Sequence, residues 1–199
     1  MNIVPSIIEV TSRGERTIDV YSKLLRDRTV MLIGEIDDDS SSSVVAQLLH
    51  LESVNPEKSI KLLINSNGGS ITSGLSIYDT MQYVNPDVET VITGIAASMA
   101  SVIAQAGAPG KRSIMPNARM MIHQPLGSIS GSVSDAEITY KEMLFYKNRI
   151  AEIYRDHNTA GHDVEYFMKI MDRDTYFSAE QVVEMGLADG VLMQRPLYG

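Results

Sequence analysis

Short apolar runs alternate with segments of helical periodicity along most of this chain, and this alternation constrains its fold more than any other feature. Apolar runs of strand length occupy residues 29–36, 60–64 and 88–93. Each is followed by a segment whose apolar residues recur three or four positions apart, as on one face of a helix. Strands that alternate with helices indicate an α/β domain with a largely parallel sheet, and no Pro-, Gly- or Ser-rich linker divides the 199 residues.

The same reasoning predicts the elements toward the carboxyl end. Two Asn-Pro pairs, at 55–56 and 85–86, end the helices before them, because the residue that precedes proline avoids helical geometry. Ser134 with Glu137 fits a capping box at the start of a long amphipathic helix. Helices are expected over residues 70–83, 98–106, 134–158 and 164–171, and further strands over 111–115, 119–123 and 190–192.

Composition excludes several classes of function. Seventeen basic and twenty-five acidic side chains give a formal net charge of −8, which repels phosphate backbones, so no nucleic-acid partner is expected. The absence of cysteine excludes disulfides, cysteine-ligated metals and a cysteine nucleophile. The longest uncharged run, residues 90–110, is too polar and too broken by Gly and Pro for a membrane span. The first residues lack the charged and apolar regions of a signal peptide, so we expect a cytoplasmic protein without a membrane partner.

Three segments follow the carboxyl ends of predicted parallel strands, where α/β proteins bind their ligands. Gly68 and Gly69, in an expected turn over residues 65–69, can point backbone N–H groups into a cleft without a Cβ in the way. Ser98 is expected in the first turn of a helix, where unpaired amides favour developing negative charge. His123, at a strand end, could reach Ser98 as a general base. Taken alone, each feature is more often structural: a tight turn, a closely packed helix or a satisfied histidine.

Together these residues suggest a serine nucleophile activated by histidine. Such a base needs a carboxylate to hold its tautomer, and the spacing does not choose between Asp172 and Asp174. The amides of Gly68 and Met99 would stabilise the oxyanion of an acyl transfer. The Gly/Ser segment 127–134 could pair its extended backbone with a bound peptide, or form a flexible loop without a ligand. No carboxylate–histidine spacing predicts a metal, and no glycine-rich loop carries the lysine of a phosphate-binding loop.

The chain resembles the proteolytic subunit of the Clp protease, the ClpP family, over nearly its whole length. The segments that carry the resemblance are, in order, residues 4–5, 11–16, 64–66 with 68–69, 76–82, Ala96-Ala97-Ser98-Met99, 110–112, Met121-Ile122-His123-Gln124-Pro125-Leu126-Gly127 and Asp172-Arg173-Asp174. It implies a crotonase-like α/β fold with repeated ββα-type units in a single domain over residues 1–199. An N-terminal arm or axial loop of about residues 1–20 and a protruding handle helix within about 125–158 belong to that fold.

The resemblance also implies a serine endopeptidase with an acyl-enzyme mechanism. The residue roles that it implies are Ser98 as nucleophile, His123 as general base, Asp174 as its orienting acid, the amides of Gly68 and Met99 as oxyanion hole, Gly127, Ser128 and Ile129 as substrate-binding residues, and Asp172 and Arg173 as oligomerisation residues that sense ring–ring contact. No metal or other cofactor is implied, because ATP is used by a partner unfoldase and not by this chain.

Assembly follows from the resemblance as well. Heptameric rings would stack in pairs into a tetradecamer, whose chamber hydrolyses unfolded polypeptides delivered by an AAA+ unfoldase of the Clp family. The positions that usually form apolar docking pockets for the unfoldase hold His50, Lys61 and Leu63. A charged lysine head weakens a pocket that depends on apolar burial. This departure favours an alternative, a weakly active or regulatory paralogue that needs a second ClpP-type subunit in mixed rings.

A third interpretation is an enzyme of the crotonase-like fold that uses the same pair of amides on acyl-CoA thioesters. Against it, Ser98 and His123 both fall in peptidase motifs, and no basic cluster is placed for the phosphates of CoA.

Overall fold

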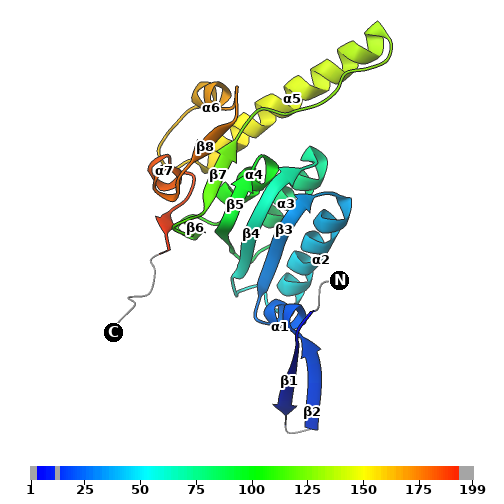
Figure 1. Ribbon diagram of the computed structural model, residues 1–199, viewed down its shortest axis with the longest axis vertical. Coiled ribbons are helices and arrows are strands. Elements are labelled where there is room, and N and C mark those ends of the chain that lie inside the picture. Colours follow the sequence, from blue (N-terminus) through cyan, green and yellow to red (C-terminus); the bar gives the residue numbers. More distant parts are fainter. Residues whose placement is uncertain (1–3, 12–13, 193–199) are drawn as a thin grey trace.

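A mostly parallel sheet forms the centre of the protein (Figure 1). The computed structural model describes residues 4–11 and 14–192. In these residues the strands of the central sheet are β3 (Thr29–Ile36), β4 (Ile60–Gly69), β5 (Val88–Ala97), β6 (Arg112–Ile114), β7 (Arg119–Ile122), β8 (Thr175–Phe177) and β9 (Gly190–Val191). The order is β3-β4-β5-β6-β9, with β7 paired to β5 and β8 to β7. Only the β7–β8 pairing within this described sheet is antiparallel, so the predicted α/β class is confirmed.

Helices cover the sheet and bury one face of its strands. Those of the described residues are α1 (Val20–Arg26), α2 (Asp38–Val54), α3 (Ile71–Tyr83), α4 (Met99–Gln105), α5 (Val133–His157), α6 (Val164–Ile170) and α7 (Ala179–Glu184). Alternate residues of β4, namely Ile60, Leu62 and Ile64, join a hydrophobic core with apolar residues of α2 and α3. Strand alternation therefore turns Lys61 and Leu63 to the opposite face. Within the described ranges, no helix combines the length and apolarity needed to cross a membrane.

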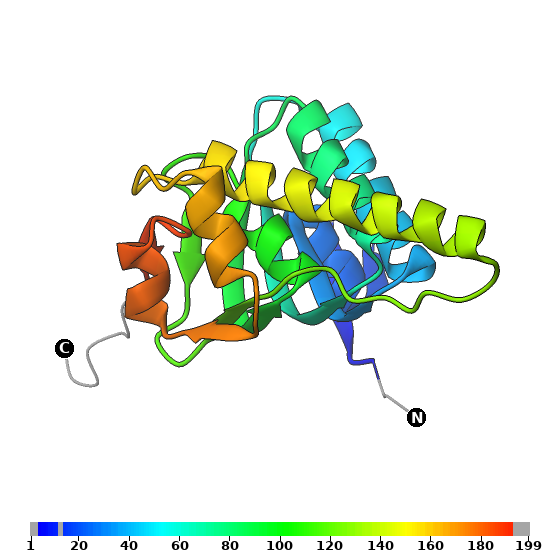
Figure 2. The ribbon, with the colours of Figure 1, turned by 90° about the horizontal axis from the view of Figure 1, so that it is seen from above.

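The long helix α5 projects from the rest of the chain, as Figures 1 and 2 both show. It begins at Val133, because Ser132 and Asp135 form the capping box: Ser132 Oγ accepts from the Asp135 amide at 3.2 Å, and Asp135 Oδ2 accepts from the Ser132 amide at 3.1 Å. The predicted box of Ser134 and Glu137 is wrong by two residues. The shorter aspartate carboxylate reaches the same amide that a glutamate usually serves.

Two segments predicted as turn or loop are strands. Residues 65–69 continue β4, because β3 extends beside them and pairs Ile36 with Gly69 after a shift of register. Near the amino end, β1 (Ser6–Thr11) and β2 (Gly14–Asp19) form an antiparallel hairpin that points away from the sheet (Figure 1), where an N-terminal arm or axial loop of about residues 1–20 was expected. Cross-strand backbone pairing forms this hairpin, and residues 12–13 lie outside the described part.

Arg112 links the segment before β9 to α4 and α5. Its guanidinium, 2% exposed, lies 2.5 Å from Asp189 Oδ1, and its Nη1 donates to the carbonyls of His157 at 2.7 Å and Gln105 at 3.1 Å. Burial raises the pKa of the Asp189 carboxyl, but the hydrogen bonds from Arg112 outweigh this and lower it below the ordinary value of 3.8. The ion pair thus stabilises the fold above that pH, and the contribution is lost as the pH falls through the lowered pKa.

We predict that Arg112→Leu lowers the free energy of unfolding at neutral pH by about 3–5 kcal/mol, because it leaves Asp189 charged and largely buried without its cationic partner. Urea denaturation measures this change. The loss should shrink below pH 4, and adding Asp189→Leu should recover part of it. Equal stability of parent and Arg112→Leu at pH 7 would contradict the assignment.

Candidate active site

β5 carries Ser98 at its carboxyl end, and the two halves of this strand pair with different neighbouring strands. Its first half pairs with β6 through Ile92, and from Ile95 onward it pairs with β7. At the irregularity between the two halves, Asn65 Oδ1 accepts a hydrogen bond from the Ile95 amide at 3.1 Å. Because Ala97 then lies opposite Met121, the residues that follow β5 and β7 emerge side by side.

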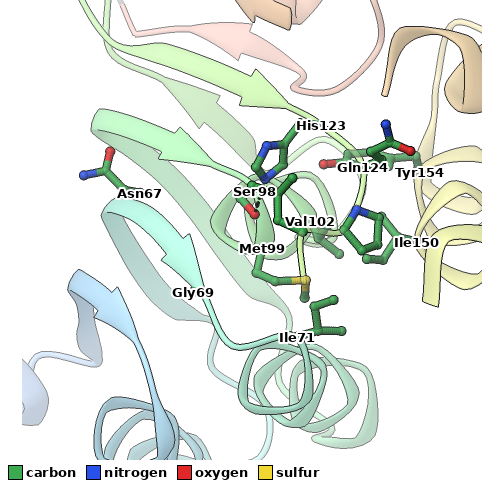
Figure 3. Close-up of a pocket in the computed structure, with 12 residues that line it drawn as sticks. Asn67, Gly69, Ile71, Ser98, Met99, Val102, His123, Gln124, Ile150 and Tyr154 are labelled. Carbon is green, nitrogen blue, oxygen red and sulfur yellow. Dashed lines mark hydrogen bonds between the residues drawn. The ribbon is translucent and has the colours of Figure 1, made fainter. Parts of the chain in front are cut away.

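Ser98 occupies the sharp turn between β5 and α4. Its φ of 54° and ψ of −126° lie where residues with a Cβ are rarely found. Its amide donates to the Met121 carbonyl at 3.0 Å, and its own carbonyl accepts from the Ser101 amide at 2.9 Å. A strained strand-to-helix turn of this kind exposes a serine hydroxyl above the sheet. Figure 3 shows the Ser98 side chain directed at His123.

His123, one residue after β7, links Ser98 to Asp174. Its Nε2 lies 2.8 Å from Ser98 Oγ and its Nδ1 lies 3.1 Å from Asp174 Oδ1. The imidazole is 13% exposed and the Asp174 side chain 61%. β8 explains the choice of acid: its antiparallel pairing places Thr175 opposite Ile122, so the residue before Thr175 reaches His123. The carboxylate of Asp172 instead lies 3.7 Å from Arg173 Nε.

Gly68 and Met99 meet beside Ser98. A Cβ on Gly68 would stand 2.6 Å from the Ala97 carbonyl oxygen and 3.0 Å from the Met99 nitrogen, and its φ is 89°. Only glycine therefore fits this close approach. Met99 is the first residue of α4, so its amide has no intrahelical acceptor. The Gly68 amide donates to Ser66 Oγ at 3.0 Å, and it would have to share or leave this bond to bind an oxyanion.

Gln124 connects the segment that carries Asp174 to the long helix. Its backbone amide donates to the Met171 carbonyl at 2.6 Å and its Nε2 to the Asp172 carbonyl at 2.9 Å. From α5, Lys147 Nζ donates to Gln124 Oε1 at 2.9 Å. Sequence reasoning missed Gln124 and Lys147. Only the position of Gln124 next to His123 could have singled it out.

A cavity of about 230 Å³ opens beside Ser98 (Figure 3). Its walls are mostly apolar, and no Asp, Glu, Lys or Arg is among the described residues that line it. They are Asn67, Gly69, Ile71, Ser98, Met99, Val102, His123, Gln124, Pro125, Leu126, Ile150 and Tyr154. Such a wall suits an uncharged, apolar side chain next to the serine hydroxyl.

The remaining candidate residues lie on the surface. Gly127, Ser128 and Ile129 are exposed in the irregular segment between β7 and α5. Asp172 and Arg173 are exposed in the loop before β8, Arg173 at 88%. Nowhere in the described ranges do three or more His, Asp or Glu side chains gather as they would around a metal ion.

The three docking positions lie on two elements. His50 is exposed on α2, whereas Lys61 and Leu63 belong to β4, where Lys61 is exposed and Leu63 half-buried. A charged group thus stands beside an apolar one on the outward face of the sheet.

A family model described as Clp protease matches residues 12–195 of the 199. The match spans β2 to β9 and includes Ser98, His123 and Asp174.

Proposed function

This chain belongs to the Clp protease family, and from that premise we propose that it is a serine endopeptidase subunit acting on unfolded proteins and peptides. The observation that carries the proposal is the hydrogen-bonded series of Ser98, His123 and Asp174 beside an apolar cavity. A serine with a histidine base that is itself held by a carboxylate is the arrangement that acyl transfer requires.

The proposed mechanism follows from these contacts. Ser98 Oγ attacks the carbonyl carbon of the scissile peptide bond while His123 Nε2 takes the serine proton. Asp174 holds the proton on His123 Nδ1 and stabilises the imidazolium. The C–N bond then breaks as His123 returns its proton to the leaving amine. A water molecule attacks the acyl-enzyme by the same route in reverse, which releases the acid and restores Ser98.

The amides of Gly68 and Met99 are proposed to bind the oxyanion that forms in both steps. We predict that Gly68→Ala lowers kcat by about 10²–10³, the effect of losing one such donor, because its Cβ would displace the Ala97 carbonyl or the Met99 amide. Steady-state peptide hydrolysis measures the loss. Gly190→Ala is the matched control, since nothing lies within 4 Å of a Cβ there. Full activity in Gly68→Ala would contradict the assignment of this oxyanion hole.

Self-association is the second part of the proposal. The family implies ring assembly, and we propose heptameric rings stacked into a tetradecamer. The exposed first half of α5 supports this proposal. The buried residues of the helix all lie from Ile150 onward. In its first half, the side chains of Val133, Ile138 and Phe145 are exposed at 88%, 67% and 58%. Apolar side chains on a projecting helix are typical of an interface. Asp172 and Arg173 are exposed in the loop before β8, next to Asp174, and we propose that they sense contact between rings.

We further propose a cytoplasmic location, an AAA+ unfoldase of the Clp family as partner, and no cofactor on this chain. Lys61 favours a second candidate function, because its exposed charge weakens the apolar docking surface around Leu63. In that case the chain is a weakly active or regulatory subunit, completed by a ClpP-type paralogue in mixed rings.

Labelling with a fluorophosphonate probe, together with native mass spectrometry on the same sample, tests both parts. Probe uptake at Ser98 and a mass of fourteen chains support the full proposal. A folded protein that takes up no probe until a paralogue is added would favour the regulatory subunit. A protein that labels as a monomer would contradict the chamber but not the peptidase.

A further inference from the structure

The turn that carries Ser98 needs support from its surroundings. A residue with a Cβ is strained at φ 54° and ψ −126°, and this conformation persists only where neighbouring groups hold it. On one side the Ser98 amide is held by Met121 of β7. On the other side its carbonyl oxygen accepts from the Ser101 hydroxyl at 2.6 Å, from the Ser101 amide at 2.9 Å and from the Val102 amide at 3.4 Å.

The Ser101 hydroxyl is itself held by Tyr154 of α5. The two hydroxyl oxygens lie 2.6 Å apart, and both side chains are buried. A serine hydroxyl has one proton to donate, and here it points to the Ser98 carbonyl. Tyr154 is therefore the donor to Ser101 Oγ, which also satisfies its own buried hydroxyl. The resulting order is Tyr154 to Ser101 to the Ser98 carbonyl.

Tyr154 is fixed in place by its ring. The ring stacks on Phe167 of α6, with centroids 5.3 Å apart and planes 18° from parallel, and it lines the cavity beside Ser98 (Figure 3). Burial raises the pKa of the Tyr154 phenol well above its ordinary value, so the hydroxyl keeps its proton throughout the range in which a peptidase works. The side-chain hydrogen bonds of this pair join Tyr154, Ser101 and the Ser98 carbonyl, and within the described residues they do not include His123 or Asp174.

We propose that Tyr154 and Ser101 are positioning residues for the peptidase, acting through the Ser98 carbonyl. By holding that carbonyl they keep the turn in the conformation that directs Ser98 Oγ at His123 and leaves the Met99 amide open. Neither hydroxyl need touch the substrate. The inference rests on the proposed function, since it concerns the nucleophile of that reaction.

The experiment compares Tyr154→Phe, Ser101→Ala and the double variant with the parent. We measure the rate of fluorophosphonate labelling, kcat and KM for a short fluorogenic peptide, the Tm and the native mass. Tyr154→Phe keeps the ring in the cavity wall, so we expect KM to stay within about twofold of the parent value. We expect kcat and the labelling rate to fall about tenfold, which is less than the about 10²-fold loss of rate that a full misplacement of a reacting group causes. Tyr166→Phe is the matched control, because its ring also contacts Phe167.

The double variant separates positioning from stability. Ser101→Ala alone leaves the Tyr154 hydroxyl buried without a partner and should lower the Tm, whereas removing both hydroxyls should restore much of it. We expect kcat to stay low in the double variant despite the recovered Tm. Recovery of both kcat and the Tm in the double variant would overturn the inference. So would a Tyr154→Phe variant with the kcat and labelling rate of the parent. A parent that takes up no probe at Ser98 would overturn the proposed function, and the inference with it.

Discussion

Ser98→Ala is expected to abolish fluorophosphonate labelling and to lower kcat for peptide hydrolysis by about 10⁶, as loss of the serine does in an unrelated serine peptidase. The substitution removes the hydroxyl oxygen that lies 2.8 Å from His123 Nε2. The hydrogen bond from the residue 98 amide to the Met121 carbonyl and the one from the Ser101 amide to the residue 98 carbonyl remain, so the turn and the fold should be kept. Labelling and hydrolysis are measured on samples of equal Tm and native mass.

Ser76→Ala is the matched control for this experiment. Ser76 is an exposed serine on α3, and its loss should leave both labelling and hydrolysis at the level of the parent. Probe uptake by Ser98→Ala at the parental rate would mean that the nucleophile lies elsewhere.

Asp174→Asn is expected to lower kcat by about 10⁴ with little change in KM. Asparagine has nearly the same size, so the loop before β8 should keep its shape. It carries no charge to stabilise the imidazolium, however, and its amide can donate to His123 Nδ1, which favours the wrong tautomer. Steady-state hydrolysis at saturating peptide, with the native mass as a check on assembly, measures the effect.

Asp172→Asn is the informative comparison, because local spacing did not distinguish the two acids and only the family resemblance favoured Asp174. Its carboxylate faces Arg173 and not His123, so we expect a change in native mass, with the chemistry kept wherever the assembly persists. If Asp172→Asn lost labelling at an unchanged mass while Asp174→Asn kept it, the two roles would have to be exchanged.

Several parts of this protein could be predicted from local sequence. Residues 29–36 form β3 as expected, because an apolar run of strand length bounded by polar residues has few other ways to bury its side chains. The Asn-Pro pairs at 55–56 and 85–86 mark the ends of α2 and α3 to within two residues, for a steric reason that involves only neighbouring residues. Ser98 and His123 stood out because both follow strands whose carboxyl ends share one edge of a parallel sheet.

Other parts depend on partners far away in the sequence. The extension of β4 through Gly69 is imposed by β3, and the hairpin of β1 and β2 by cross-strand pairing. The choice of Asp174 follows from the pairing of β8 with β7, because a strand of three residues carries too little periodicity to be read in advance.

The sequence by itself determined the alternation of strands and helices in the middle of the chain, where several of them start and stop, and which serine and histidine stand at strand ends. These properties depend on sterics and burial within a few neighbouring residues. Local spacing left the carboxylate open, and the tertiary structure places Asp174 beside His123. Only the tertiary structure shows how the Ser98 turn is strained and that Ser101 and Tyr154 are hydrogen-bonded behind it. These depend on distances of about 3 Å between residues up to 53 positions apart, which no local pattern encodes.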